Sequence, residues 1–172
     1  AICFNDRGKS KRFYSKLSYS EGWCFSTLLS QYFLSLITVV LRRSALNNLE
    51  HWFDARFQII EEADLFRRIG YFWKLAMVKD VLGKWRVHGS SLTWTKHHLL
   101  LEETSLMLTE YSKMIPEFRK IFSKEITILN ISIIVDEASH LLREGNNTKA
   151  RKYLSPYKMK NTKAFIFYIM TL

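Results

Sequence analysis

The chain has 172 residues, a net charge of +10 and 48% hydrophobic residues, too much apolar content for a disordered chain and enough for a buried core. Its two cysteines exclude a disulfide framework and a cysteine-rich metal site. The positive charge favours anionic partners, namely nucleotide phosphates, anionic lipid or nucleic acid. The longest apolar run, residues 27–41, is shorter than the roughly 20 residues that span a membrane.

The first part of the chain predicts alternating strands and helices. Residues 1–4 indicate a strand, and the basic and aromatic residues after it favour a solvated loop over a nucleic-acid-binding segment. Residues 20–36 carry apolar residues at helical spacing behind a serine N-cap. The β-branched run 37–41 predicts a strand buried on both faces, and residues 44–50 predict a short helix.

The stretch 53–70, FDARFQIIEEADLFRRIG, predicts a helix that begins near Glu61. At a spacing of 3.6 residues per turn, one face then carries Glu62 beside the large apolar residues Leu65, Phe66 and Ile69. That face should point into the core, so Glu62 would lie at the entrance of a buried helix face. A carboxylate in this position is a candidate acid or base, and the alternative is an ordinary solvated acid of a first helical turn.

The other charges of this predicted helix have structural interpretations. Glu61, Glu62 and Asp64 fall in the first turn, where the helix dipole favours negative charge. Arg67 and Arg68 follow Asp64 by three and four residues, which is the stabilising order for an ion pair on a helix. The sequence offers no such partner to Glu62.

A second candidate site lies in residues 81–88, after a predicted short strand at 71–78. The alternation of residues 81–88 predicts a strand with Arg86 and His88 on one face, just before Gly89. A guanidinium and an imidazole at a strand end can bind phosphate or help to hold a metal. The alternative is the exposed polar face of an edge strand, and the spacing does not decide between the two.

The chain becomes helical after Trp94. Residues 96–114 predict an amphipathic helix, and residues 117–142 predict a second helical stretch broken near Asn130. Gly145 should end that stretch before another short helix, and residues 164–172 begin an apolar one. We therefore expect two domains, residues 1–94 and 95–172.

The stretches GWCFSTLLSQYF, ITVVLRRSAL, FDARFQIIEEADLFRRI and KWRVHGSSLT, in this order, resemble the C-terminal half of a family 2 glycosyltransferase domain of the GT-A type. The resemblance covers about residues 20–94. It implies an α/β fold in which residues 1–94 form the acceptor-side part of a GT-A domain, without the N-terminal nucleotide-binding half. Residues 95–172 would then be an α-helical extension.

The resemblance also implies roles for particular residues. The acidic pair, the following acid and arginine, and the closing basic and histidine element of the family correspond here to Glu61, Glu62, Asp64, Arg68, Arg86 and His88. Glu62 would be the general base, with Glu61 as the alternative, and Asp64 would belong to the same catalytic cluster. Arg68 and Arg86 would bind the donor phosphates, and His88 would lie at the metal.

The implied activity is an inverting sugar transfer from a nucleotide-diphosphate sugar, aided by Mg²⁺ or Mn²⁺, to the hydroxyl of a sugar or lipid-linked acceptor in polysaccharide biosynthesis. Such an enzyme is expected in the cytoplasm, with peripheral contact at the inner face of the membrane. The 172 residues contain no Asp-x-Asp metal element, so we expect no transfer by this chain alone.

The alternative function is a non-enzymatic, basic helical module that binds nucleic acid or an anionic membrane surface. The net charge is compatible with this module as much as with the transferase. The predicted inward position of Glu62 and the strand position of Arg86 and His88 favour the transferase, which makes nucleic acid the less favoured partner.

Overall fold

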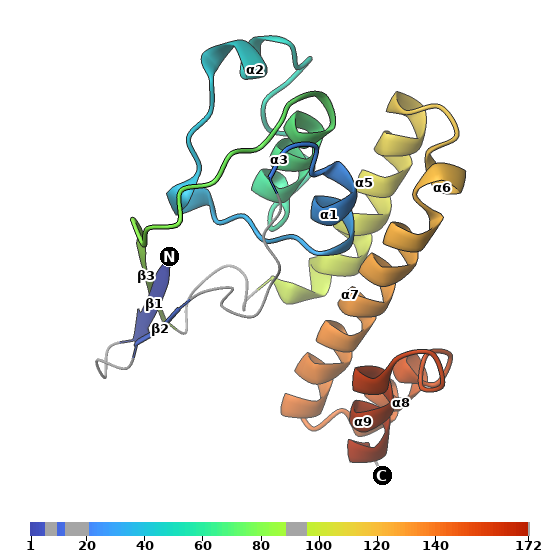
Figure 1. Cartoon of the computed structure of the whole chain (residues 1–172). Coiled ribbons are helices and arrows are strands. Elements are labelled where there is room, and N and C mark those ends of the chain that lie inside the picture. The colour runs from blue at the N-terminus through green and yellow to red at the C-terminus, as the bar shows by residue number, and fades with distance from the viewer. Residues whose placement is uncertain (6–9, 13–20, 89–95, 172) are drawn as a thin grey trace. The chain divides into compact units, whose positions relative to one another are not determined.

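The computed structural model describes residues 1–5, 10–12, 21–88 and 96–171, which divide into two units, Ala1–Leu99 and Leu100–Leu172 (Figure 1). The elements described in the first unit are β1 (Ile2–Asn5), β2 (Ser10–Arg12), α1 (Phe25–Ser30), the 3-10 helix η1 (Leu36–Thr38), α2 (Arg43–Asn47), α3 (Glu61–Phe72), β3 (Lys84–Val87) and the 3-10 helix η2 (His97–Leu99). The second unit is described as helices only.

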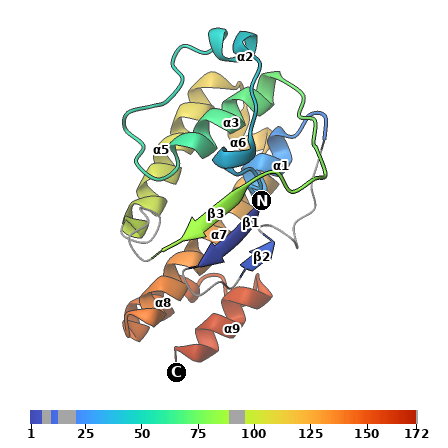
Figure 2. The same ribbon diagram turned by 90° about the vertical axis from the view of Figure 1, so that its left-hand side faces the viewer.

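The three short strands of the first unit form one sheet in the order β2-β1-β3 (Figure 2). β1 and β2 are antiparallel, with Cys3 opposite Lys11. β1 and β3 are parallel, with Cys3 opposite Trp85, although some eighty residues separate them in the sequence. The predicted strand at the N-terminus and the predicted strand before Gly89 are therefore neighbours.

The predicted α/β fold of the GT-A type is wrong for this structure. The protein is 58% helical, and β1 and β3 are the parallel pair of its small sheet. Two of the predicted strands, residues 37–41 and residues 71–78, do not form. A GT-A domain needs a larger sheet than the described strands provide.

The two missing strands have separate physical explanations. Residues 37–41 are β-branched, but the described chain places no strand beside them, and Val40 is 96% exposed. A strand without a hydrogen-bonding neighbour is not stable. Tyr71 and Phe72 instead complete α3, and beyond them Leu75 forms an isolated bridge with Gly22.

Two other predictions for the first unit are confirmed, and a third is met only in part. Helix α3 begins at Glu61 as its acidic first turn predicted, and β3 lies within residues 81–88. The helix expected at residues 20–36 is shorter, because α1 ends at Ser30, whose hydroxyl donates back to the carbonyl oxygen of Ser26 at 3.0 Å. Such side-chain bonds to the preceding turn weaken a helix.

The core of the first unit lies where α1 packs against α3. Leu28 of α1 and Leu65, Phe66 and Ile69 of α3 are all buried. The helices approach closely at Gly70, since a Cβ atom there would lie 2.8 Å from Cδ1 of Leu28. The predicted inward face of α3 is therefore confirmed for its apolar members.

The second unit consists of α5 (Leu100–Met114), α6 (Phe118–Ile121), α7 (Ser123–Arg143), α8 (Asn147–Leu154) and α9 (Thr162–Met170). The break expected near Asn130 is wrong, because α7 runs through that residue and the interruption lies at Phe122. Asn130 is exposed between the buried Leu129 and Ile131, so packing overrides its modest helix propensity. No described helix has both the length and the apolarity to cross a bilayer.

The helix ends of the second unit follow the sequence more closely. Gly145 ends α7 with a φ of +77°, which glycine adopts without strain. Asn146 then caps α8, and Asn161 caps α9, each by accepting a backbone N–H three residues later. The last three helices share a core made of Ile131, Val135, Ala138, Leu141, Ala150, Leu154 and Ala164.

Candidate functional site

Helix α3 contains all the predicted acidic site residues within its first turn. Its N-cap is Ile60, which offers no side-chain cap, so the carboxylates of Glu61, Glu62 and Asp64 are the nearby groups that match the positive end of the helix dipole. The three carboxylates have different surroundings, and those surroundings decide what each can do.

Asp64 forms a buried ion pair with Arg68. Nε of Arg68 lies 2.8 Å from Oδ2 of Asp64, and the two residues are 7% and 3% exposed. Two further nitrogens of Arg68 donate to the backbone carbonyl oxygens of His51 (2.8 Å) and Trp52 (2.6 Å). This pair therefore fixes the segment before α3 to the helix, and its groups are committed to that contact.

Arg67 fixes the other side of the helix, a role that the sequence did not reveal. Its Nε donates to the carbonyl oxygen of Leu28 at 2.9 Å, and its guanidinium carbon lies 5.0 Å from the centre of the Tyr32 ring. Arg67 is 4% exposed. The only available signal was an arginine next to the core positions of a buried helix, where a charge must find a partner.

Glu62, in the first turn of α3, is half-buried. Its partial burial raises the pKa of the carboxyl group, and the neighbouring charge of Glu61 raises it further. A backbone hydrogen bond and the charge of Arg67 act in the opposite direction without cancelling the effect. A carboxylate with a raised pKa holds a proton more readily, which is the property that a general base requires.

Glu61 is half-buried too, and its Oε2 atom is out of reach of water. Among the described residues, no hydrogen-bond donor meets that oxygen. A buried polar atom without a partner costs about 1–3 kcal/mol, so such atoms mark positions where a ligand or another segment can supply the missing donor. The alternative between Glu61 and Glu62 as the base therefore stays open on geometry.

Of the predicted phosphate and metal residues, Arg86 and His88 lie at the small sheet, whereas Arg68 lies on α3 and is paired with Asp64. Arg86 is in β3 and His88 follows its last residue, and both are exposed, whereas Trp85 and Val87, which alternate with them along the chain, are half-buried. The alternation of exposure within β3 agrees with the prediction for Arg86, but His88 lies one residue beyond the strand, so the shared strand face stays a prediction. β3 packs against β1 and α3 packs against α1, so the basic residues and the carboxylates belong to different packing groups of the unit.

The described residues do not fit a metal site. No three His, Cys, Asp or Glu side chains in that part of the chain come close enough together to hold an ion. His88 lies at an exposed strand end, and Asp64 is already paired with Arg68. The Mg²⁺ or Mn²⁺ that the resemblance implies would therefore need ligands from outside the described residues.

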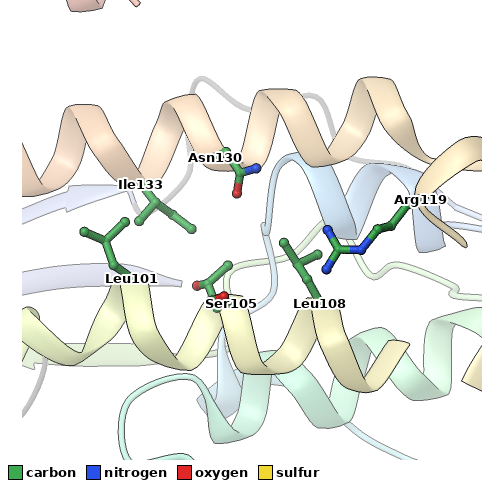
Figure 3. Close-up of a pocket in the computed structure, with 7 residues that line it drawn as sticks. Leu101, Ser105, Leu108, Arg119, Asn130 and Ile133 are labelled. Atoms are coloured by element: carbon green, nitrogen blue, oxygen red, sulfur yellow. The ribbon is translucent and has the colours of Figure 1, made fainter. Parts of the chain in front are cut away.

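A cavity of about 240 Å³ lies within the second unit, between α5, α6 and α7 (Figure 3). Its wall combines apolar and polar side chains, namely Leu101, Thr104, Ser105, Leu108, Arg119, Asn130 and Ile133. Figure 3 shows Arg119 and Asn130 directed toward the space above Leu108. The sequence did not predict this cavity, because its lining residues are spread over three helices.

Comparison with known proteins gives no match: no family model, no curated protein and no solved structure is similar to this chain.

Proposed function

We propose that this chain supplies the general base of an inverting glycosyltransferase, and that the base is Glu62. The single observation that supports the proposal is the partial burial of Glu62, which raises the pKa of its carboxyl group. The order of the sequence stretches around it adds support through the resemblance to family 2 glycosyltransferases. The proposal rests on the site, since the fold differs from the one that the resemblance implied.

In this reaction the carboxylate of Glu62 takes the proton of an acceptor hydroxyl. The hydroxyl oxygen forms a bond to the anomeric carbon of the donor sugar, and the bond between that carbon and the nucleoside diphosphate breaks with its electron pair on the diphosphate. Attack from the face opposite the leaving group inverts the anomeric centre. A general base of this kind contributes about 10²–10⁴ in rate.

The contacts on either side of Glu62 fix the helix that carries it. The Asp64–Arg68 pair and the Arg67–Leu28 contact fix α3 on two sides, so the first turn has little freedom to move. A base held in place loses less entropy when the acceptor hydroxyl arrives. Arg86 of β3 and His88, which follows that strand, would contact the diphosphate end of the donor in the same proposal.

Donor binding requires groups that these 172 residues do not contain. The sequence has no Asp-x-Asp, and the described residues hold no metal-ligand cluster. The proposal therefore concerns a protein in which this sequence is joined to a nucleotide-sugar-binding part, acting on a sugar or lipid-linked acceptor.

The test compares Glu62→Gln, Glu61→Gln and Glu50→Gln in that complete protein, assayed with nucleotide-diphosphate sugars and Mg²⁺ or Mn²⁺. Glu50 is an exposed acid of the same unit and serves as the matched control. We expect Glu62→Gln to lower kcat by about 10²–10⁴ with little change in KM, because the base acts in the transition state. Full turnover by Glu62→Gln would exclude Glu62, and a comparable loss in Glu61→Gln alone would assign the base to Glu61.

A further inference from the structure

The C-terminal part of the second unit carries an unbalanced positive charge. From Gly145 onward the sequence contains six basic residues and no Asp or Glu. The six are Lys149, Arg151, Lys152, Lys158, Lys160 and Lys163. These six charges compare with a net charge of +10 for the whole chain, so this segment is the most basic part of the unit's sequence.

Helix α9, in the same segment, is apolar on two opposite faces. One face, with Ala164 fully buried, packs against α7 and α8. The opposite face exposes four large apolar side chains at positions that recur with the helical period, Phe165, Ile166, Ile169 and Met170. Between 44% and 59% of each of these residues is exposed. A helix that is apolar all round is normally covered on all sides.

The basic residues and the apolar face belong to one preformed structure. α8 and α9 pack against each other and against α7 (Figures 1 and 2). The ring of Tyr168 lies 4.5 Å from the guanidinium carbon of Arg151 and 4.4 Å from Nζ of Lys158. Nζ of Lys158 also donates to the Tyr168 hydroxyl at 3.3 Å. Cations of α8 and of the turn are therefore held beside α9.

We propose that α9 and the basic residues around it bind the surface of an anionic lipid bilayer. The exposed face of α9 would enter the boundary between headgroups and acyl chains, and the lysines would contact the anionic headgroups. An exposed apolar helix face beside a basic surface can bind in this way, because apolar area is buried and the cations attract anionic lipid. The helix has nine residues, so it lies in the interface and does not span it.

Two other partners could cover the exposed face of α9, a second copy of the chain or nucleic acid. Charge and chemistry favour a bilayer over both. A second copy of the chain would bring like charges together, which disfavours self-association through this surface. Nucleic acid gains affinity from bases stacked on aromatic rings, but the rings of Tyr153, Phe167 and Tyr168 already have cations of the chain itself over them. The exposed face of α9 is mostly aliphatic, and only an apolar phase would cover it favourably.

The test measures flotation of the 172-residue chain with vesicles of equal parts phosphatidylglycerol and phosphatidylcholine, and with vesicles of phosphatidylcholine alone. We expect binding to the anionic vesicles and little to the neutral ones. Ile166→Ser with Ile169→Ser should weaken binding about tenfold or more, since less apolar area enters the interface. Lys160→Gln with Lys163→Gln should weaken it about 30-fold, because each cation near an anionic surface contributes about fivefold.

The matched control is Ile121→Ser with Lys124→Gln, an exposed apolar residue and an exposed cation of α6 and α7. It should bind as the parent does. Circular dichroism of every variant checks that the helices are retained, and all the substituted side chains are exposed. The proposal concerns the second unit alone, so it holds or fails independently of Glu62.

Three results would overturn the proposal. One is the absence of binding to anionic vesicles. Another is binding that survives the substitution of Ile166 and Ile169, which would show a purely electrostatic surface such as one for nucleic acid. The last is concentration-dependent dimerisation that the same substitutions abolish, which would assign the face of α9 to a second copy of the chain.

Discussion

Arg68 and Asp64 form an ion pair of 2.8 Å in which both side chains are almost completely buried. The pair is linked to the backbone of His51 and Trp52, so it connects α3 to a segment that has no regular structure of its own. Breaking a buried pair leaves the remaining charge without compensation. The cost of that uncompensated charge gives the first prediction.

Asp64→Ala should lower the free energy of unfolding by about 3–5 kcal/mol, because Arg68 would remain buried without its partner. Urea denaturation of the parent and the variant measures this loss. Lys113→Ala removes the exposed ion pair with Glu110 and should cost about 1 kcal/mol or less. Equal, small losses in the two variants would show that the Asp64–Arg68 pair is not a structural anchor.

The stability of Glu62→Gln should depend on pH in the direction set by the raised pKa of Glu62. Because burial raises that pKa, the folded chain binds the proton more tightly than the unfolded chain. Stability is therefore lost as pH rises from the ordinary carboxyl pKa through the raised one. We expect the stability of Glu62→Gln relative to the parent to be higher at about pH 7 than at about pH 3.5.

Urea denaturation at the two pH values measures this difference, and the exposed Glu50→Gln serves as control. A relative stability of Glu62→Gln that is the same at both pH values would show that Glu62 titrates normally. A gain in stability together with a loss of turnover would be typical of a site residue, whose surroundings are arranged for function at some cost in stability.

The pKa of Asp54 is lowered, in contrast to the raised pKa of Glu62. The hydrogen bond from the Arg56 side chain lowers the pKa of Asp54 to about 2. The contribution of the Asp54–Arg56 pair to the free energy of unfolding is therefore present at neutral pH and lost as pH falls from about 4 to about 2. Carboxyl NMR titration of the parent should show this low pKa, and Arg56→Gln should raise it toward the ordinary range. An unchanged pKa in that variant would exclude Arg56 as the cause.

How far the sequence predicts this structure depends on whether the signal is local. Glu61 as the start of α3, Gly145 as the end of α7 and Asp64–Arg68 as an ion pair all follow from helix chemistry within a few residues. The strand at residues 37–41 was wrong because its formation depends on a neighbouring strand, which no local pattern reports. The predicted helix break near Asn130 was wrong for a similar reason, because α7 continues through that residue as a result of packing with other helices.

The candidate site divides in the same way. The position of Glu62 beside an apolar helix face was predictable, because it follows from the helical period alone. The contact of Arg67 with Leu28 was not, because it depends on how α1 lies against α3. The unpartnered oxygen of Glu61 was not predictable, because it depends on which hydrogen-bond donors of the described chain lie near it in the folded structure.

Gly70 and Leu28 should show coupled effects on stability. Gly70→Ala alone gains about 1 kcal/mol of helix propensity but places a Cβ atom against the buried Leu28, an overlap that costs about 1–3 kcal/mol. In a Leu28→Ala background the overlap is absent, so the same substitution should be stabilising. A double-mutant cycle by urea denaturation measures the coupling, and additive effects would contradict the close packing of α1 on α3.

The central claim is that the Glu62 carboxyl group is partly removed from water. Carboxyl-detected NMR titration of the 172-residue chain, with the Glu62 signal assigned by Glu62→Gln, tests it directly. We expect the pKa of Glu62 to lie above the ordinary range of a glutamate side chain. A pKa of Glu62 within or below that range would contradict the account.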